Sequence, residues 1–171
     1  MGLEHVRRTY EEFGREDPFY AVLSVAGRER GGWDPEAFYA TGRREVGRVL
    51  EHVRSLGLRL PSGTALDFGC GAGRLSLALA DHFDSVVGVD ISSSMLDTAR
   101  RHNEHGERVR FRLNVEPHLE QFASDRFAFI YSNITLQHVP RRPAEAYIAE
   151  FFRVLAPVGV AVFQVPNGRP W

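Results

Sequence analysis

Cysteine is almost absent from this sequence of 171 residues, and lysine is absent altogether. The single cysteine, Cys70, cannot form a disulfide within the chain and offers no cysteine framework for a zinc site. No stretch approaches the roughly 18 apolar residues that span a membrane, and the N-terminus has no apolar run typical of a signal peptide. These absences favour a cytoplasmic protein that does not act at a membrane.

An excess of charge of either sign is also missing. The 21 basic residues, all arginine, stand against 22 acidic ones, and the net charge is −1. No overall positive field therefore favours nucleic acid as a partner. His102 and His105 lie three residues apart, but no carboxylate or cysteine pattern completes a metal site around them. We expect neither a nucleic-acid partner nor a bound metal.

The length and a hydrophobic content of 43% predict a single globular domain. Two helices are expected near the start, one over residues 3–13 and one from the cap Asp34 to about Leu56, with a loop-rich stretch over 15–32 between them. The chain from residue 61 onward shows a different pattern. We therefore expect residues 1–60 to form a helical lid over a core made by residues 61–171.

Within that core, short apolar strands alternate with helices. Strands are expected at 64–68, 85–90, 109–113, 127–131 and 159–165, and helices at 73–82, 92–105 and 143–155. Apolar strands separated by helices predict a mostly parallel sheet with helices on both faces. The expected fold class is therefore α/β, with a doubly wound sheet that binds its ligand at the carboxyl ends of the strands.

The strongest signal for chemistry is the segment LDFGCGAGRL, from Leu66 to Leu75. A strand ends here, glycines allow a tight turn and close approach to a ligand, and a helix begins. About 17 residues after Gly73 the second apolar strand ends at Asp90, whose carboxylate can accept hydrogen bonds from both hydroxyls of a ribose. Together these features predict a ligand of the adenosine type.

Two kinds of adenosine ligand remain open at this point. A dinucleotide pattern that starts at Gly69 needs glycine where Arg74 stands, but a pattern that starts at Gly71 ends on the small residue Ser76. A nicotinamide-dependent oxidoreductase therefore stays an alternative. Asp67 favours the other ligand, because a carboxylate there repels a pyrophosphate and suits the ammonium and sulfonium charges of S-adenosylmethionine.

Residues 64–165 resemble the class I S-adenosylmethionine-dependent methyltransferases, in particular those of type 11. The resemblance rests on four segments in the family's order and spacing: LDFGCGAGRLS, VVGVDISSSML, FAFIYSNITLQHV and EFFRVLAPVGVAVFQV. It implies a Rossmann-like fold and S-adenosylmethionine as the cofactor. It also implies in-line transfer of a methyl group, and we expect a small-molecule or sugar-type acceptor.

The resemblance further implies a set of cofactor contacts. By position, Asp67, Gly69, Cys70, Gly71 and Gly73 would surround the methionine half, Asp90 would hold the ribose, Ile91 and Met95 would lie beside the adenine, Asn114 near the adenine edge, and Ser132 beside the methionine end. Cys70 has no paired histidine or other base in this pattern. It is therefore expected to be an inert small residue of the turn and not a nucleophile.

Catalytic and substrate-binding residues are less well defined by the pattern. His138 follows the fourth strand near the expected substrate entrance, either as a general base or as a helix-end residue that bonds only backbone. Tyr10, Tyr20 and Trp33 offer aromatic faces to a sulfonium, although packing between helices is the alternative for all three.

Three departures from the family pattern stand out. Ala128 replaces an aspartate, and Val158 replaces a turn glycine, at a cost of about 1 kcal/mol if its φ angle is positive. The chain also stops at Trp171, short of the helix and hairpin that follow the fifth strand in the family. We expect that strand to be an open apolar edge through which two copies form a homodimer. The same departures leave a third function open, a degenerate S-adenosylmethionine-binding domain that regulates or scaffolds a partner.

Overall fold

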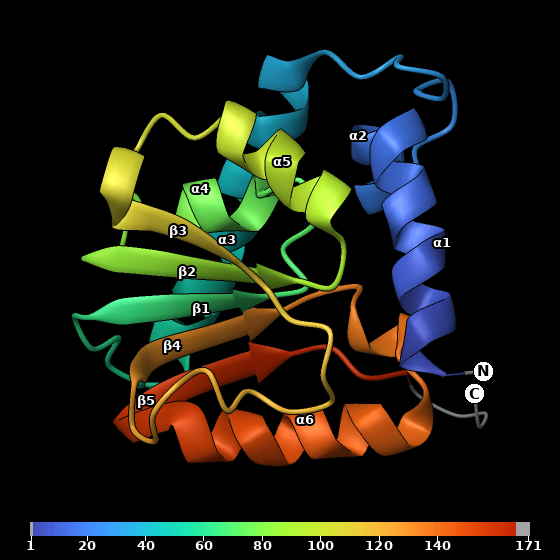
Figure 1. Ribbon diagram of the computed structural model, residues 1–171. Helices are drawn as coiled ribbons and strands as arrows, with labels where there is room; N and C mark the ends of the chain where they lie inside the picture. Colours follow the sequence, from blue (N-terminus) through green and yellow to red (C-terminus); the bar gives the residue numbers. More distant parts are fainter. Residues whose placement is uncertain (1, 167–171) are drawn as a thin grey trace.

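A computed structural model describes residues 2–166 and shows one sheet of five parallel strands in the order β3-β2-β1-β4-β5 (Figure 1). The strands are β1 (Thr64–Phe68), β2 (Ser85–Asp90), β3 (Val109–Leu113), β4 (Phe127–Ser132) and β5 (Leu155–Phe163). The chain winds outward from β1 in both directions, so the strand order reverses between β1 and β4. The predicted doubly wound α/β fold is confirmed, and ligands of such folds bind beside this reversal, at the carboxyl ends of the strands.

Helices cover both faces of the sheet and one of its ends. They are α1 (Leu3–Glu16), α2 (Pro18–Val22), α3 (Pro35–Ser55), α4 (Arg74–Leu79), α5 (Ser93–Arg101) and α6 (Arg141–Val154), with short 3-10 turns η1 (Gly106–Arg108) and η2 (Leu136–His138). In Figure 1, α3, α4 and α5 lie on one side of the sheet, and α6 lies on the other. Helix α1 stands across the end toward which the strand arrows point.

Local sequence signals explain the long helix α3. The Asp34 side chain accepts a hydrogen bond of 2.9 Å from the backbone N–H of Ala37, and Pro35 occupies the first turn. After its last residue the chain turns through Gly57, whose φ of +77° is the left-handed conformation that glycine adopts at low cost. The predicted start and end of this helix are confirmed.

Other boundaries differ from the prediction. The stretch predicted as loop-rich contains α2, which Asp17 caps by accepting a hydrogen bond from the N–H of Tyr20. Helix α5 ends four residues early, because the Asn103 side chain donates to the carbonyls of Gly106 and Val109 and turns the chain toward β3. Strand β5 begins at Leu155, directly after α6, and not at residue 159 as predicted.

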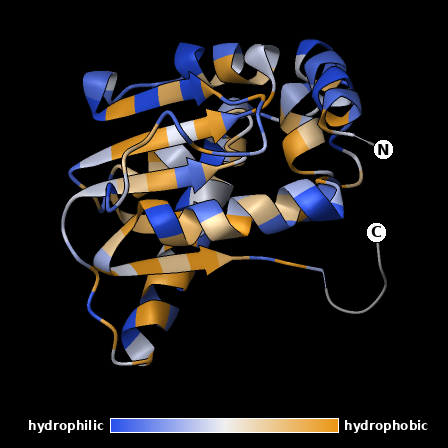
Figure 2. Cartoon of the chain, turned by 60° about the horizontal axis from the view of Figure 1, so that its bottom comes forward, coloured by the Kyte–Doolittle hydropathy of each residue, from blue (hydrophilic) through white to orange (hydrophobic). Residues whose placement is uncertain are grey.

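The sheet divides the apolar interior into two layers because neighbouring strand residues face opposite sides. On β1, Ala65 belongs to the layer under α3, α4 and α5, whereas Leu66 and Phe68 belong to the layer under α6. Figure 2 shows most of the strands as largely apolar, whereas the edge strand β3, with two arginines, and helix α6 are alternately polar and apolar along their length. The pattern follows from a sheet covered on both faces.

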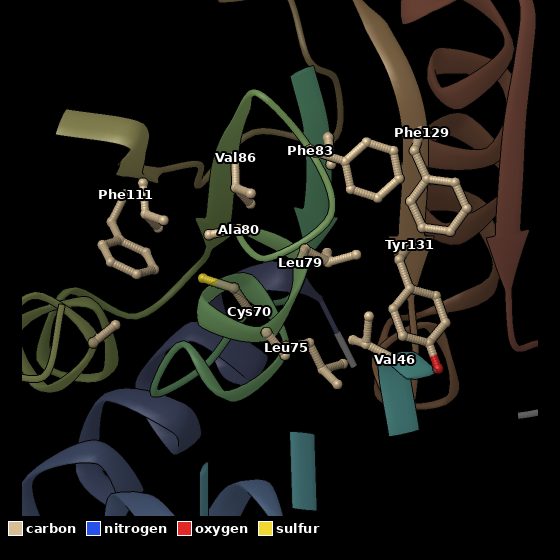
Figure 3. Close-up of a cluster of buried hydrophobic side chains, with 14 of the residues drawn as sticks. Val46, Cys70, Leu75, Leu79, Ala80, Phe83, Val86, Phe111, Phe129 and Tyr131 are labelled. Atoms are coloured by element: carbon tan, nitrogen blue, oxygen red, sulfur yellow. The ribbon is translucent and has the colours of Figure 1, made fainter. Parts of the chain in front are cut away.

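The layer under α3 and α4 is packed through aromatic rings (Figure 3). Phe83 stacks on Phe129 with ring centroids 5.0 Å apart, and Tyr131 lies beside Val46 of α3. Helix α3 comes very close to α4 at Gly42, where an added Cβ would lie 2.2 Å from the Arg74 carbonyl oxygen. A larger residue at this position would push α3 away from the turn that precedes α4.

Strand β5 is one of the two edges of the sheet, since β4 is its one neighbour within residues 2–166. Self-association of two copies through this edge stays a prediction.

Within residues 2–166, no helix is both long and apolar enough to cross a membrane.

Val158 lies between the two β5 residues Leu155 and Val160, where the pairing of β5 with β4 shifts register, and it adopts the strained conformation that its sequence position suggested. Its φ is +59°, and 89% of its surface is exposed. A β-branched residue in the left-handed region costs energy that a glycine does not. Because the side chain is so exposed, no packing offsets this cost.

Replacing Val158 with glycine should therefore raise the free energy of unfolding by about 1 kcal/mol, after allowance for the greater freedom of glycine in the unfolded chain. For a chain of this size that corresponds to roughly 2–4 °C in melting temperature. Val158→Ala is the matched control: it retains a Cβ and should gain less than half as much in thermal or denaturant unfolding. Equal gains for both variants would show that strain at φ is not the cause.

Candidate functional site

A cavity lies at the carboxyl ends of β1, β2 and β4, beneath α1. It is lined by Leu3, Val6, Tyr10, Ala21, Val22, Phe68, Gly69, Gly71, Val89, Asp90, Ile91, Met95, Asn114, Asn133, Ile134, Thr135, His138, Val139 and Tyr147. Its volume of about 100 Å³ is below the roughly 300–1,000 Å³ typical of ligand pockets. Residues of the two N-terminal helices, α1 and α2, form part of this lining.

The glycine turn between β1 and α4 forms one wall. Gly69, Gly71 and Gly73 have φ angles of +76°, +51° and +82°, so each needs the freedom of glycine. The N–H groups of Gly69 and Cys70 both donate to the carbonyl of Val89, which ties the turn to the end of β2. Gly73 also allows close packing, because an added Cβ would lie 2.9 Å from Ala99.

Asp90 lies in the cavity wall at the end of β2, as the sequence predicted. Its Oδ2 accepts a hydrogen bond of 2.8 Å from the N–H of Gly71, and its Oδ1 accepts one of 2.9 Å from the N–H of Ser92. Burial raises the pKa of this carboxyl above its ordinary value, although the backbone N–H groups oppose the change. Asp90 thus offers a carboxylate to the cavity and holds the glycine turn in place.

Asp67 lies outside the cavity lining, buried beneath the glycine turn with 1% of its surface exposed. Its Oδ2 accepts a hydrogen bond of 2.6 Å from the Ser76 hydroxyl, and its Oδ1 has no hydrogen-bond partner in the described part of the chain. Burial raises the pKa of Asp67 to about 7, against the smaller opposing effects of the Ser76 hydrogen bond and the Arg74 charge. This carboxyl is poorly solvated and lies two residues before the glycine turn.

Asn114 lines the cavity, but its amide is already bonded to protein groups. Its Nδ2 donates to the Glu116 carbonyl at 2.7 Å and to the Tyr147 hydroxyl at 3.3 Å, while its Oδ1 accepts from Gln121. Tyr147, on α6, was not predicted as a site residue, although it lines the cavity. The sequence could have indicated it, because Tyr147 lies on the apolar face of an amphipathic helix and a buried tyrosine hydroxyl requires a hydrogen-bond partner.

Two further cavity residues form an aromatic pair. The rings of Tyr10 and His138 meet edge to face with centroids 5.8 Å apart. Partial burial lowers the pKa of His138 below its ordinary value, so the imidazole is neutral near pH 7. Burial, with the nearby Asp90 charge, raises the pKa of Tyr10 to about 12 and keeps that hydroxyl protonated. The pair places an imidazole, whose Nε2 lies 3.1 Å from the Gln137 amide nitrogen, beside a protonated phenol at the cavity wall.

Of the residues named from sequence, the cavity brings together Tyr10, Gly69, Gly71, Asp90, Ile91, Met95, Asn114 and His138. Outside its lining lie Asp67, Cys70, Gly73, Ser132, Tyr20 and Trp33. The Cys70 thiol is buried and its pKa is raised by that burial, Ser132 donates its hydroxyl to the Phe68 carbonyl, and the Trp33 indole donates to the Leu23 carbonyl. These three polar groups are occupied by structural contacts.

Sequence reasoning missed the part of the wall that follows β4, namely Asn133, Ile134 and Thr135. Ile134 has a φ of +59°, which is rare for a β-branched residue. The Thr135 hydroxyl lies 3.1 Å from the Asn133 carbonyl and 3.4 Å from the Gly69 carbonyl. Strained residues of this kind concentrate at functional sites. No sequence signal marks the strain, because isoleucine is not a turn residue.

The N-terminal helices are fastened over the cavity by specific contacts. The Glu11 carboxylate of α1 accepts hydrogen bonds from the hydroxyls of Ser92 and Ser93 and from the N–H of Ser94, at 3.0–3.2 Å. From α2, Val22 reaches the glycine turn so closely that a Cβ added at Gly71 would lie 2.6 Å from its methyl group. The space beside the turn is therefore filled by α2 in this state.

Within residues 2–166, no group of three or more histidine, cysteine, aspartate and glutamate side chains is arranged to hold a metal ion.

Comparison with known proteins finds methyltransferases among the relatives of this chain. The trans-aconitate 2-methyltransferase of Variovorax paradoxus is 33% identical over 144 residues, which are 80% of this chain and 51% of that protein. The ubiquinone biosynthesis O-methyltransferase of Bordetella avium is 28% identical over 139 residues, or 81% of this chain and 57% of that protein. This chain therefore spans about half the length of these two relatives.

Among solved structures, phosphoethanolamine N-methyltransferase 1 of Haemonchus contortus, in complex with phosphoethanolamine and S-adenosylhomocysteine, shares the fold. The TM-score is 0.64 at 17% identity, over 91% of this chain and 31% of that chain. The profile of a family described as a methyltransferase domain matches residues 65–159. Because this match covers more than half of the sequence, the chain belongs to the methyltransferase domain family.

Proposed function

We propose that this chain binds S-adenosylmethionine and transfers its methyl group in line to a small-molecule or sugar-type acceptor. One observation carries the proposal: a turn of three left-handed glycines is hydrogen-bonded to Asp90 at the carboxyl ends of the strands, beneath helices that close over it. The turn supplies close backbone approach, and the carboxylate supplies two acceptors for a ribose diol.

The chemistry of the wall fits the cofactor. Asp90 would accept the ribose hydroxyls, Gly69 and Gly71 would adjoin the methionine part, and Ile91 with Met95 would pack against the adenine. Asp67 would not contact the cofactor, because it lies outside the cavity lining and is buried beside the Ser76 hydroxyl. Asn114 would reach the adenine edge only by giving up one of its present partners.

When bound, the cofactor supplies an electrophilic methyl group on a positively charged sulfur. The protein's task is then to align the acceptor atom with that methyl group and to exclude water, which is worth about 7–11 kcal/mol in favourable cases. Helices α1 and α2 would serve as the lid that excludes water, since both line the cavity and α1 is fastened through Glu11. His138, neutral near pH 7, would accept the proton of an acceptor hydroxyl, with Tyr10 beside it.

The relatives support a small acceptor, because their names record trans-aconitate and a ubiquinone precursor pathway as the context of methylation. They do not agree on one acceptor. The acceptor of this chain is therefore proposed only at the level of a small molecule.

Calorimetry tests the proposal directly. S-adenosylmethionine and S-adenosylhomocysteine should bind with micromolar dissociation constants, equivalent to about −8 kcal/mol. A nicotinamide dinucleotide is the control and should give no heat, since Arg74 stands where that ligand's pattern needs glycine. Binding of the dinucleotide without binding of either sulfur-containing ligand would refute the proposal.

A further inference from the structure

A carboxylate outside the cavity joins two of its walls. Glu45, in the middle of α3, has 18% of its side chain exposed. Its Oε2 accepts a hydrogen bond of 2.8 Å from Arg74, and its Oε1 accepts one of 2.8 Å from the Tyr131 hydroxyl and one of 2.7 Å from the Asn133 amide. Glu45 is absent from the cavity lining, so it does not touch a ligand there.

The first of these contacts leads to the glycine turn. Arg74 is the first residue of α4, directly after Gly73, and only 3% of its side chain is exposed. Its guanidinium also donates to the Thr41 hydroxyl at 3.3 Å. A buried guanidinium without its carboxylate would be strongly unfavourable, so the pair fixes the start of α4 against α3.

The other contact leads to the opposite wall. Asn133 lines the cavity and begins the post-β4 turn, Asn133–Thr135, which contains the strained Ile134. The Ile134 N–H donates to the Gln164 side chain at 3.0 Å, and the Thr135 hydroxyl lies 3.4 Å from the Gly69 carbonyl. A left-handed isoleucine persists only where its surroundings hold it, and the Asn133 bond to Glu45 is one of these restraints.

We propose that Glu45 is a positioning residue for the proposed reaction, on which this inference rests. From outside the cavity, its one carboxylate sets the glycine turn and the post-β4 turn relative to each other. Both turns line the space where the methionine end of the cofactor and the acceptor would meet. Figure 3 shows Tyr131, the third partner of Glu45, beside Val46 of α3, in the layer between the sheet and helices α3 and α4.

The test measures the dissociation constant of S-adenosylhomocysteine by calorimetry, with melting temperature as the second readout. Glu45→Gln keeps the shape but removes the charge, and Asn133→Ala removes one arm of the network. Each should weaken binding about fivefold to tenfold. The dissociation constant of the double variant should be no more than about tenfold above that of the parent, because both changes break the same connection between Glu45 and the post-β4 turn. Tyr131→Phe is the matched control, because Tyr131 donates to the same Oε1 atom but does not line the cavity. It should lower the melting temperature and leave the dissociation constant within twofold of the parent value.

A variant that is not expected to unfold completes the test. Ile134→Gly relieves the strained φ and removes a side chain that lines the cavity, so it should raise the melting temperature and weaken binding. Combined with Glu45→Gln, which acts on the same turn, it should weaken binding by less than the product of the two single losses. If the parent protein fails to bind S-adenosylhomocysteine, the proposed function itself is wrong. If the parent binds but Glu45→Gln and Ile134→Gly bind equally well, or the double variant shows the product of the single losses, Glu45 does not position the site.

Discussion

Replacing Asp90 with alanine should weaken binding of S-adenosylhomocysteine by about 10-fold to 150-fold, equivalent to about 1.5–3 kcal/mol. Two charge-assisted hydrogen bonds from the ribose would be lost, in a wall where burial makes each bond stronger than in water. Calorimetry at a temperature where the variant is folded measures the loss.

The structure adds a second consequence to this variant. The Asp90 carboxylate also accepts the N–H groups of Gly71 and Ser92, so its removal leaves two backbone donors without their partners. We therefore expect Asp90→Ala to lower the melting temperature as well. A carboxylate at the end of a strand with no backbone partners would not have this effect. Asp90→Asn retains one acceptor oxygen and should fall between the parent and the alanine variant.

Asp97→Ala is the matched control for charge. Asp97 lies on α5, near Asp90 in sequence, but its side chain is exposed and forms an ion pair with Arg100. Its removal should leave the dissociation constant unchanged. An unchanged constant in Asp90→Ala would instead place the ligand away from the end of β2.

The parts of the site that sequence predicted are those fixed by local backbone conformation. The three glycines of the turn all have positive φ, and a strand followed by such glycines leaves few alternatives for the chain. Asp90 follows from the same logic, because the carboxyl ends of neighbouring parallel strands meet at one edge of the sheet. The cap Asp34 and the terminating Gly57 likewise act within a few residues of their own helix.

The parts that sequence did not predict depend on contacts between distant residues. Glu45 meets Tyr131 and Asn133 across more than 80 positions, and Val22 reaches Gly71 from a helix of five residues that is too short for a periodic pattern. The alternation of side chains along β1 could have predicted that Asp67 does not line the cavity. Asp67 shares the face of Ala65, toward α3 and α4, whereas Phe68 faces the other side and lines the cavity.

The buried position of Asp67 predicts an unusual dependence of stability on pH. Its carboxyl has a pKa of about 7 in the folded protein, chiefly because of burial, against an ordinary value of 3.8. Between these pH values the folded protein retains a proton that the unfolded chain has released, so the contribution of Asp67 to stability falls as the pH rises. Each pH unit in this window costs about 1.4 kcal/mol, and the full cost near pH 8 approaches about 4 kcal/mol.

Asp67→Asn should remove this cost, because asparagine has a similar size, carries no charge and can still accept the Ser76 hydrogen bond. We expect the variant to gain about 2–4 kcal/mol relative to the parent between pH 5 and pH 8, measured by denaturant unfolding at both pH values. Comparing the two proteins cancels the carboxyls whose pKa is lowered by folding, such as Glu11 and Glu150, since both proteins retain them. Asp97→Asn, at an exposed carboxyl, should show no such gain. A constant difference between parent and Asp67→Asn from pH 5 to pH 8 would mean that Asp67 does not titrate in this window, and that its unpartnered Oδ1 is solvated in the folded protein.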